Sequence, residues 1–280
     1  MSLNSSCKQS NHDITQNKIL PEKKDNKFFE IKLQETKPAI DMCLKSYEKI
    51  GVCLNKKSST KINSNNLDKV CFIIINTYEK DNQNLGKGPL NDGLLIGINH
   101  HRIGYKVFYL YNPLQEEFLK FLGYFLQNTT QSLTVFYSGL DSSASNVHDI
   151  EFTNGPLSSN IVSDVIYRNI NENSNVLFIT DSCHGGTVFD INSLCSIFSR
   201  KSANVISFSV KKEGNKVDSS HILQSHGIFT NYFCKAMSDC PTISPKHLVE
   251  RINPSILRFN ESLKFEVTSS KLAKSPIFQK

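Results

Sequence analysis

The sequence predicts an α/β fold: a doubly wound, mainly parallel sheet of about six strands with helices on both faces. Two observations predict it. Short, continuous apolar runs, typical of strands covered on both faces, alternate with longer segments of helical spacing. Strand and helix segments also follow one another along the chain, which is the order that produces parallel strands joined by crossover helices.

The predicted strands are rich in Val, Ile, Leu, Phe and Tyr and lie between polar or Gly-containing segments. They cover residues 70–76, 105–111, 133–137, 176–180, 204–210 and 263–268. The last segment alternates between apolar and polar residues, which is typical of an edge strand. Polar residues directly follow three of these strands, at 76–77, 138–140 and 181–183. In open parallel sheets ligands bind at such strand ends, so these three positions predict the site.

Segments with apolar residues at helical spacing lie between the predicted strands. It predicts helices at about 91–101, 113–126, 160–170, 227–237 and 245–252. The Ser-rich segment 141–159 interrupts this alternation, and its Asn154-Gly155-Pro156 sequence predicts a hairpin turn.

Composition predicts a boundary between an N-terminal extension, residues 1–65, and the α/β domain, residues 66–280. Residues 1–30 are rich in Ser, Asn, Lys and Gln and have no periodic apolar pattern. Apolar residues at helical spacing predict one helix at about 38–50, between Pro38 and Gly51. The polar segment 55–66 then marks the boundary.

Charge and cysteine usage exclude several classes of protein. Residues 1–65 hold 12 Lys and 7 Asp or Glu, so most of the formal charge of +6 belongs to the extension. The nearly neutral remainder does not predict nucleic-acid binding. The eight cysteines form no C-x-x-C pair, which speaks against zinc, and they indicate free thiols in a reducing, cytoplasmic compartment. No signal sequence or membrane-spanning run is expected, because the opening residues are polar and the apolar runs are short.

One cysteine directly follows a predicted strand, in the sequence Asp181-Ser182-Cys183-His184-Gly185-Gly186. A cysteine nucleophile must be an exposed thiolate with a base nearby and hydrogen-bond donors for an oxyanion. A residue just past a buried strand would be exposed, and the glycines let backbone N–H groups approach a carbonyl. Cys183 is therefore a candidate nucleophile; the alternative is a buried cysteine at a tight turn.

This sequence resembles the nucleophile motif of metacaspases, whose usual form is D-S-C-H-S-G, and Phe136-Tyr137-Ser138-Gly139 resembles the family's preceding strand end, F-Y-S-G-H-G. Weaker matches in the same order extend the resemblance over roughly residues 69–235. They are Asn76-Thr77-Tyr78, Leu90-Asn91-Asp92, Val205-Ile206-Ser207-Phe208-Ser209 and Gly227-Ile228-Phe229-Thr230.

The resemblance implies a caspase-like fold and cysteine endopeptidase chemistry, with Cys183 as nucleophile and the backbone N–H groups of Gly139 and Cys183 as the oxyanion site. It also implies an acidic S1 pocket, suited to an Arg or Lys side chain, that is formed by Asp92, Ser138 and Asp181.

The sequence departs from the family where the base belongs. Leu140 and Asp141 occupy the positions of the dyad histidine and the glycine after it. Leucine cannot take a proton, an unassisted thiol is only a few per cent ionised at neutral pH, and a positioned acid or base is worth roughly 10²–10⁴-fold. His148, in the segment after Leu140, is the candidate substitute base; His184, beside Cys183, is disfavoured because neighbouring side chains of an extended segment point apart.

Calcium activates many metacaspases through acidic residues near the catalytic pair. Here the corresponding regions offer only Asp149, Glu151 and Asp190, so calcium is not expected, and neither is any other metal or cofactor.

Three functions remain open. The first is a metacaspase-like pseudopeptidase, or a severely weakened peptidase, with a regulatory role and either a peptide or protein substrate or an active peptidase relative as partner. The second is an active endopeptidase that cleaves after Arg or Lys and uses His148 as base. The third is an α/β interaction module whose Cys183 is a redox-sensitive thiol.

Overall fold

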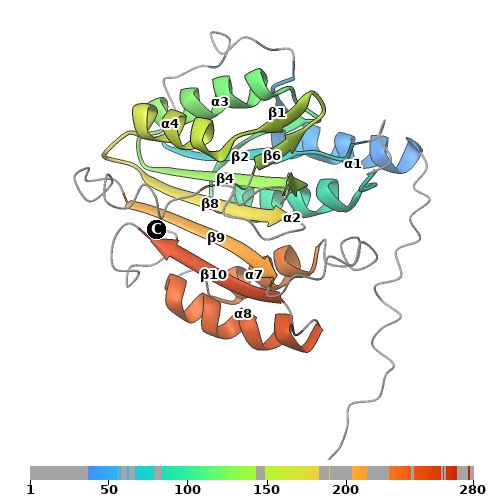
Figure 1. Cartoon of the computed structure of the whole chain (residues 1–280), viewed down its shortest axis with the longest axis vertical. Coiled ribbons are helices and arrows are strands. Elements are labelled where there is room, and N and C mark those ends of the chain that lie inside the picture. Colours follow the sequence, from blue (N-terminus) through green and yellow to red (C-terminus); the bar gives the residue numbers. More distant parts are fainter. Residues whose placement is uncertain are drawn as a thin grey trace, which may run out of the picture. The chain divides into compact units, whose positions relative to one another are not determined.

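A seven-stranded sheet forms the centre of the protein in a computed structural model (Figure 1). The structure describes residues 37–55, 57, 62, 67–78, 84–142, 149–182, 189, 204–212, 227–240, 243–259, 261, 263–269 and 277. The strand order is β1-β3-β2-β4-β8-β9-β10. The strands are β1 (Gly51–Cys53), β2 (Lys69–Ile75), β3 (Lys106–Tyr111), β4 (Ser132–Gly139), β8 (Asn175–Ser182), β9 (Asn204–Lys212) and β10 (Leu263–Ser269). All neighbouring strands are parallel except the edge strand β10, which is antiparallel to β9.

Helices cover both faces of the sheet, as the sequence predicts (Figure 1). Helices α3 (Gln115–Asn128) and α4 (Ser159–Asn169) lie on one face. Helices α1 (Lys37–Ile50), α2 (Gly88–Arg102), α7 (Ile228–Asp239) and α8 (Pro245–Phe259) lie on the other. Successive residues of β8 join opposite cores, Phe178 toward α3 and α4 and Ile179 toward α2 and α7. Because both faces of the sheet are covered, the strands appear in the sequence as continuous apolar runs.

Part of the predicted N-terminal extension packs on the α/β domain. Helix α1 forms as expected, but it packs on α2, where the Tyr47 hydroxyl donates to the Leu90 carbonyl at 2.7 Å. The next residues form β1, which pairs with β3 and makes the seventh strand. A Cβ at Gly51 would lie 2.8 Å from the Val107 carbonyl oxygen, so glycine permits this pairing. The compact unit therefore includes part of the predicted extension, because three residues of strand are too short to show a pattern.

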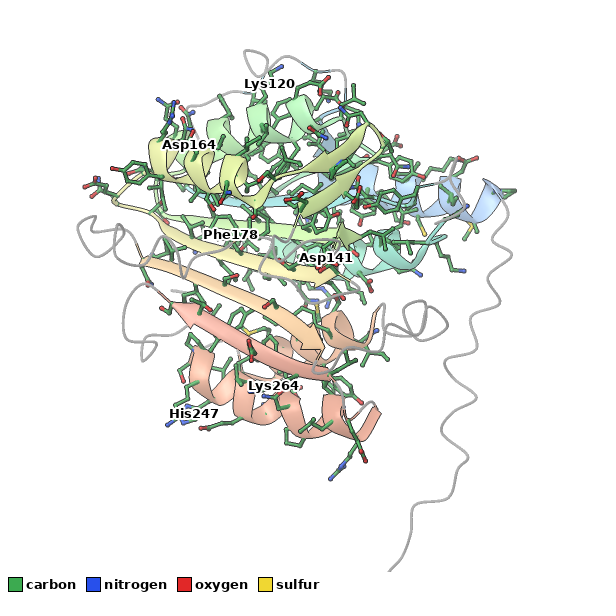
Figure 2. All side chains as sticks on the ribbon, in the orientation of Figure 1. Lys120, Asp141, Asp164, Phe178, His247 and Lys264 are labelled. Carbon is green, nitrogen blue, oxygen red and sulfur yellow. The ribbon has the colours of Figure 1, made fainter. Side chains whose placement is uncertain are left out.

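A second, three-stranded sheet follows β4 directly. It consists of β5 (Asp141–Ser142), β6 (Asp149–Phe152) and β7 (Gly155–Leu157), and the turn between β6 and β7 is the predicted hairpin. The Phe152 ring packs 5.2 Å from the Phe118 ring of α3, and Gln115 of α3 donates to the Gly155 carbonyl at 2.8 Å. These contacts hold the small sheet beside the end of β4, where Asp141 is labelled in Figure 2.

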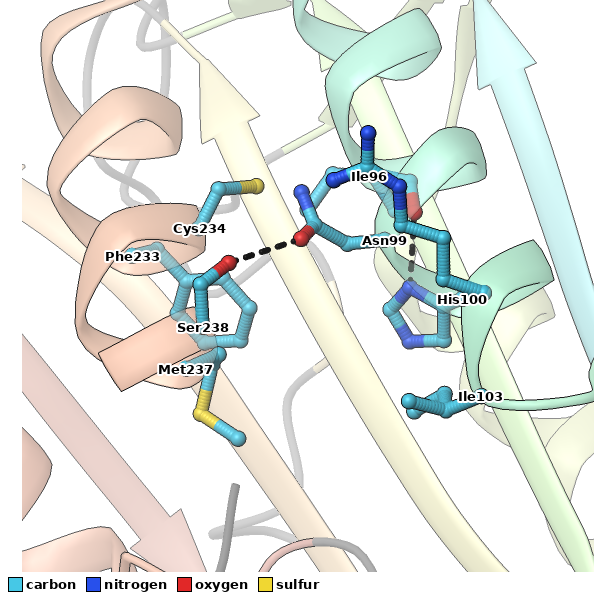
Figure 3. Close-up of a pocket in the computed structure, with 9 residues that line it drawn as sticks. Ile96, Asn99, His100, Ile103, Phe233, Cys234, Met237 and Ser238 are labelled. Atoms are coloured by element: carbon cyan, nitrogen blue, oxygen red, sulfur yellow. Dashed lines mark hydrogen bonds between the residues drawn. The ribbon is translucent and has the colours of Figure 1, made fainter. Parts of the chain in front are cut away.

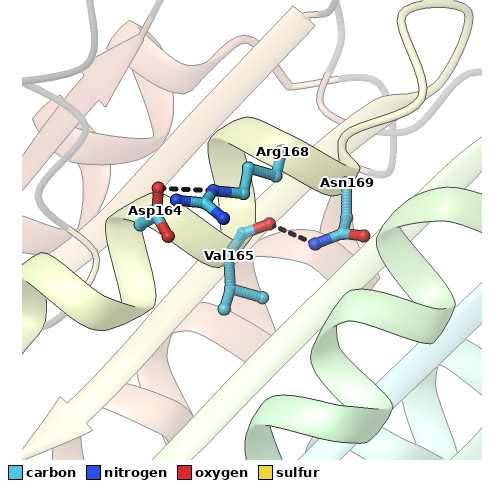
Figure 4. A network of polar contacts seen from close by, with 4 residues as sticks. All are labelled: Asp164, Val165, Arg168 and Asn169. Atoms are coloured by element: carbon cyan, nitrogen blue, oxygen red, sulfur yellow. Dashed lines mark hydrogen bonds and ion pairs between the residues drawn. The ribbon is translucent and has the colours of Figure 1, made fainter.

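Lys120 of α3 and Asp164 of α4 lie on the outer surface of these two helices (Figure 2). On α4, Arg168 donates to the exposed Asp164 carboxylate at 2.8 Å, and the Asn169 amide donates to the Val165 carbonyl (Figure 4). Such exposed pairs contribute only a few tenths of a kcal/mol. Of the helices that the structure describes, none is long and apolar enough to cross a membrane.

Candidate active site

Three predicted strand ends meet at one edge of the main sheet. Ile75 of β2 lies opposite Ser138 of β4, and Ser138 lies opposite Asp181 of β8. Phe136 and Ile179, two residues before Ser138 and Asp181 respectively, belong to the core under α2 and α7. Because strand side chains alternate between faces, Ser138 and Asp181 also lie on that face. The structure thus brings these two predicted pocket residues side by side.

Asp92 belongs to the same group. It lies in the second turn of α2, which covers this face of the sheet, and only 2% of its surface is exposed. Asp181 is 4% exposed, and it accepts a hydrogen bond from the Thr230 hydroxyl of α7 at 2.5 Å. Two carboxylates are thus buried at the edge where parallel strands end, beside Ser138, which is fully buried.

The charges of Asp92 and Asp181 both act on the thiol of Cys234 on α7. Burial raises the pKa of Cys234 to about 12, and these two charges add to the rise. A raised pKa favours the protonated thiol, which is a poor nucleophile.

Leu140, where the resemblance predicts a histidine, is held in an apolar environment. Its side chain is 8% exposed and packs in a cluster with Tyr78 and Leu85. Its backbone N–H donates to the Tyr78 hydroxyl at 2.9 Å, and its carbonyl accepts from the Tyr137 hydroxyl at 2.7 Å. The backbone N–H of Glu151 also donates to that carbonyl, at 3.1 Å. Residue 140 is thus fixed by packing and by hydrogen bonds on both sides.

Tyr78 and Tyr137 form the centre of this network. Their hydroxyl oxygens lie 3.2 Å apart, and the Tyr78 hydroxyl donates to the Glu151 carbonyl at 2.8 Å. The single Tyr137 proton is directed to the Leu140 carbonyl, and the Glu151 carbonyl lies farther from that hydroxyl, at 3.2 Å. Burial raises the pKa of each phenol, and hydrogen bonds from neighbours only partly oppose this for Tyr78. Both phenols stay protonated at neutral pH, so neither can replace a histidine base.

Gly139 is required by the same network. A Cβ at this position would lie 2.6 Å from the Tyr137 hydroxyl and 3.0 Å from the Asn76 Cβ. No side chain fits there without displacing β2 or the tyrosine. The glycine of the Phe136-Tyr137-Ser138-Gly139 motif therefore has a structural reason in this chain, independent of any role of its backbone N–H.

Some predicted residues fall outside the part of the chain that the structure describes. They are Cys183, His148, His184 and Asp190. The nucleophile, the oxyanion site and the substitute base therefore stay predictions. Among the described residues, no group of three or more His, Cys, Asp or Glu could hold a metal ion.

Sequence reasoning assigned no role to Thr230 or to Tyr78. Thr230 appeared only as the last residue of a weak motif, and its partner Asp181 is 49 positions away. The signal that could have found it is its place in the first turn of a helix that follows a strand of the parallel sheet. Tyr78 has a left-handed backbone with φ of 55°, which the sequence does not signal.

A separate cavity of about 260 Å³ lies between α2 and α7, near the opposite end of α2 from Asp92 (Figure 3). Ser238 of α7 donates to the Asn99 side chain of α2 across it, at 2.9 Å. His100 lines it and bonds the Ile96 carbonyl through Nδ1 at 2.8 Å and the Thr134 hydroxyl through Nε2 at 3.0 Å. Burial lowers the pKa of His100 to about 4. The imidazole is therefore neutral and cannot serve the distant strand ends.

Comparison with known proteins gives a result for the fold only. No family model matches the sequence, and no curated protein matches it. The structure is similar to the Drosophila initiator caspase Dronc, with a TM-score of 0.51 and 11% sequence identity, over 72% of this chain and 80% of the caspase. The chain has a caspase fold.

A protein of Geobacter sulfurreducens is similar to the same extent, with a TM-score of 0.51 and 12% identity, over 72% of this chain and 93% of that protein. At these identities the likeness concerns the arrangement of strands and helices. It confirms the α/β, mainly parallel fold with helices on both faces. Within this caspase fold, the ends of β4 and β8 carry the residues on which a functional proposal must rest.

Proposed function

We propose that this chain is a metacaspase-like pseudopeptidase, or a severely weakened cysteine peptidase, that binds basic segments of a protein partner. Cys183 is its nucleophile position, and Asp92, Ser138 and Asp181 form its S1-type pocket. The observation that carries the proposal is Leu140, buried against Tyr78 and Leu85 where the base belongs. Its role is regulatory, with a peptide, a protein or an active peptidase relative as partner.

The chemical argument concerns protons. Amide hydrolysis by a thiol needs a group that removes the thiol proton and later protonates the leaving amine. Tyr78, Tyr137 and Cys234 hold their protons at neutral pH because burial raises their pKa values. Leu140 offers neither an acceptor nor a donor on its side chain. Catalysis therefore loses a contribution of roughly 10²–10⁴-fold.

The binding argument concerns charge. Asp92 and Asp181 are almost fully removed from solvent, where an opposite charge attracts them more strongly than it would in water. Two acids at one place attract a positive charge, so a basic side chain of a partner is the complementary ligand. This part of the site does not depend on residue 140, since the acids come from α2 and β8 and Leu140 follows β4.

A peptide with Arg at P1 and a fluorogenic leaving group tests the proposal, with and without calcium. The wild-type chain should give little or no turnover, and Leu140→His with Asp141→Gly should raise it by about 10²-fold. The matched control adds Cys183→Ala to that double variant and should return turnover to background. Wild-type turnover at an ordinary peptidase rate would contradict the proposal.

A second candidate, an active endopeptidase with His148 as base, is favoured by one pairing. Asp149, the residue after His148, lies opposite Ser142, two residues beyond Leu140. Turnover by the wild type that is lost in His148→Ala would establish this candidate instead. A redox-sensitive thiol in an interaction module would show itself as Cys183 reacting with general thiol reagents and not with an Arg-directed chloromethylketone.

A further inference from the structure

We propose that the first turn of α7 sets the selectivity of the acidic pocket for a cation. Thr230 is a positioning residue for Asp181, and Gly227 is the residue against which Asp92 packs. The inference rests on the proposed function, because it explains how the acidic pocket recognises a basic side chain. It assigns these two residues a role in binding that neither the motif nor the fold specifies.

The contact between Thr230 and Asp181 is the first step. Its oxygen–oxygen separation of 2.5 Å lies at the short end of the range of a hydroxyl that donates to a charged carboxylate. Thr230 is fully buried, so no water competes for this bond. The hydroxyl engages Oδ2 and fixes the rotation of the carboxylate. The bond favours the ionised form that a cation needs.

Asp92 lies against the start of the same helix. Gly227 is the N-cap of α7, with a left-handed φ of 86°, and a Cβ there would lie 3.1 Å from Asp92 Oδ1. The carboxylate therefore packs on the bare Cα of a helix N-terminus, whose dipole favours a negative charge. The two acids, one from the sheet and one from α2, thus depend on a single helical turn.

Ser138 supplies the independent observation that points to a ligand. It lies directly opposite Asp181 in the register of β4 and β8, on the same face. Its side chain is fully buried, and its hydroxyl has no hydrogen-bond partner among the described residues. An unsatisfied buried hydroxyl is costly, so a polar group that satisfies it on binding gains that free energy. A guanidinium or ammonium group between the acids would donate to it.

Two ring contacts fix the position of the first turns of α7. The Phe229 ring packs 5.0 Å from the Phe265 ring of β10, and the Phe233 ring packs 5.8 Å from the Phe208 ring of β9. These contacts hold the helix in register, so the Thr230 hydroxyl needs no rearrangement to reach Asp181. Preorganisation of this kind lowers the entropic cost of binding.

Calorimetric binding of two peptides to the full chain tests the inference. One peptide carries Arg at P1 and the other carries citrulline, its neutral analogue, at the same place. Thr230→Val keeps the shape but removes the hydroxyl, and it should weaken binding of the Arg peptide by about tenfold. Thr230→Ser should restore it to within about twofold, and the citrulline peptide should respond to neither substitution.

Ser238→Ala is the matched control, because it breaks a hydrogen bond of the same helix far from the acids. It should leave the ratio of the two affinities unchanged. Equal affinity of the Arg peptide for wild type and Thr230→Val would overturn the inference. So would equal weakening of both peptides, which would indicate a general structural defect.

A ligand-free measurement separates this inference from the proposed function. If the wild type does not prefer the Arg peptide, the proposed function fails. Urea unfolding of Thr230→Val, Asp181→Asn and the double variant then decides the role of Thr230. A coupling of about tenfold in the unfolding constant would support the charge-assisted contact, and additive effects would contradict it.

Discussion

The ends of β4 and β8 are neighbours in the sheet, yet their environments are opposite. Leu140, after β4, lies among Tyr78 and Leu85, and its backbone groups are all taken by hydrogen bonds. Asp181, near the end of β8, is buried and accepts a hydrogen bond from the Thr230 hydroxyl of α7. The β4 end thus presents an apolar side chain, and the β8 end presents a carboxylate held by a neighbouring helix.

We infer from this difference that recognition of a ligand can persist where catalysis is lost. The β4 end is stabilised by β2, by the small sheet and by two tyrosines. At the β8 end, Asp181 bonds Thr230 of α7, and Asp92 of α2 packs against Gly227 of α7. Because the two sets of contacts share few residues, we expect a change at residue 140 to leave the acids in place.

Substituting one residue at each strand end should give the largest difference in affinity for the Arg peptide. Asp181→Asn removes a buried charge that pairs with the ligand, so the Arg peptide should bind about 10²–10³-fold more weakly. Leu140→Ala should change that affinity by less than about threefold, although it costs stability through lost packing. Calorimetry measures both affinities. A comparable loss in the two variants would show that the strand ends are not separable.

The pH dependence of stability provides a second contrast, because the group that titrates, His100, lies away from both strand ends. His100 has a folded pKa of about 4 against an ordinary value of 6.5. Between these values the unfolded chain binds the additional proton, so stability falls as pH decreases from 6.5 to 4. The loss reaches about 3 kcal/mol at the lower end.

Urea unfolding across this pH range measures the effect. His100→Gln should be less stable at neutral pH and should lose most of the decrease on acidification. His101→Gln, at the exposed neighbouring residue, should retain the decrease. An unchanged decrease in His100→Gln would assign acid sensitivity to other groups, the buried acids of the pocket among them.

Tyr78→Phe should give the smallest effect, confined to the β4 end. It leaves the Leu140 N–H without its acceptor and removes one of the donors to the Glu151 carbonyl, and an unsatisfied buried group costs about 2 kcal/mol. Urea unfolding measures the loss. Tyr105→Phe, which removes one contact with Ser132, should cost about 1 kcal/mol or less.

Affinity of the Tyr78→Phe variant for the Arg peptide sharpens the comparison further. It should equal that of the wild type, because Tyr78 contacts the β4 end and not the acids. A loss of affinity would mean that the tyrosine network also positions the pocket.

Much of the fold followed from the sequence alone, for a local reason. Periods of two and 3.6 residues report which face of a strand or helix is buried, and the order of elements then fixes a parallel sheet. Alternation predicted the edge strand at 263–268, and turn residues predicted the hairpin around Asn154-Gly155-Pro156. The resemblance, and not the periodic pattern, indicated Asp92 and Asp181 as pocket residues.

Only the tertiary structure decided what depends on residues far apart in the chain. Strand β1 joins the sheet through Val107, Leu140 is enclosed by Tyr78 and Leu85, and Thr230 reaches Asp181 across 49 positions. No local period records such contacts, because they arise from packing between elements. The sequence determined that leucine stands where the resemblance implies a histidine. The structure decided that Tyr78 and Leu85 surround this side chain and that hydrogen bonds engage its backbone.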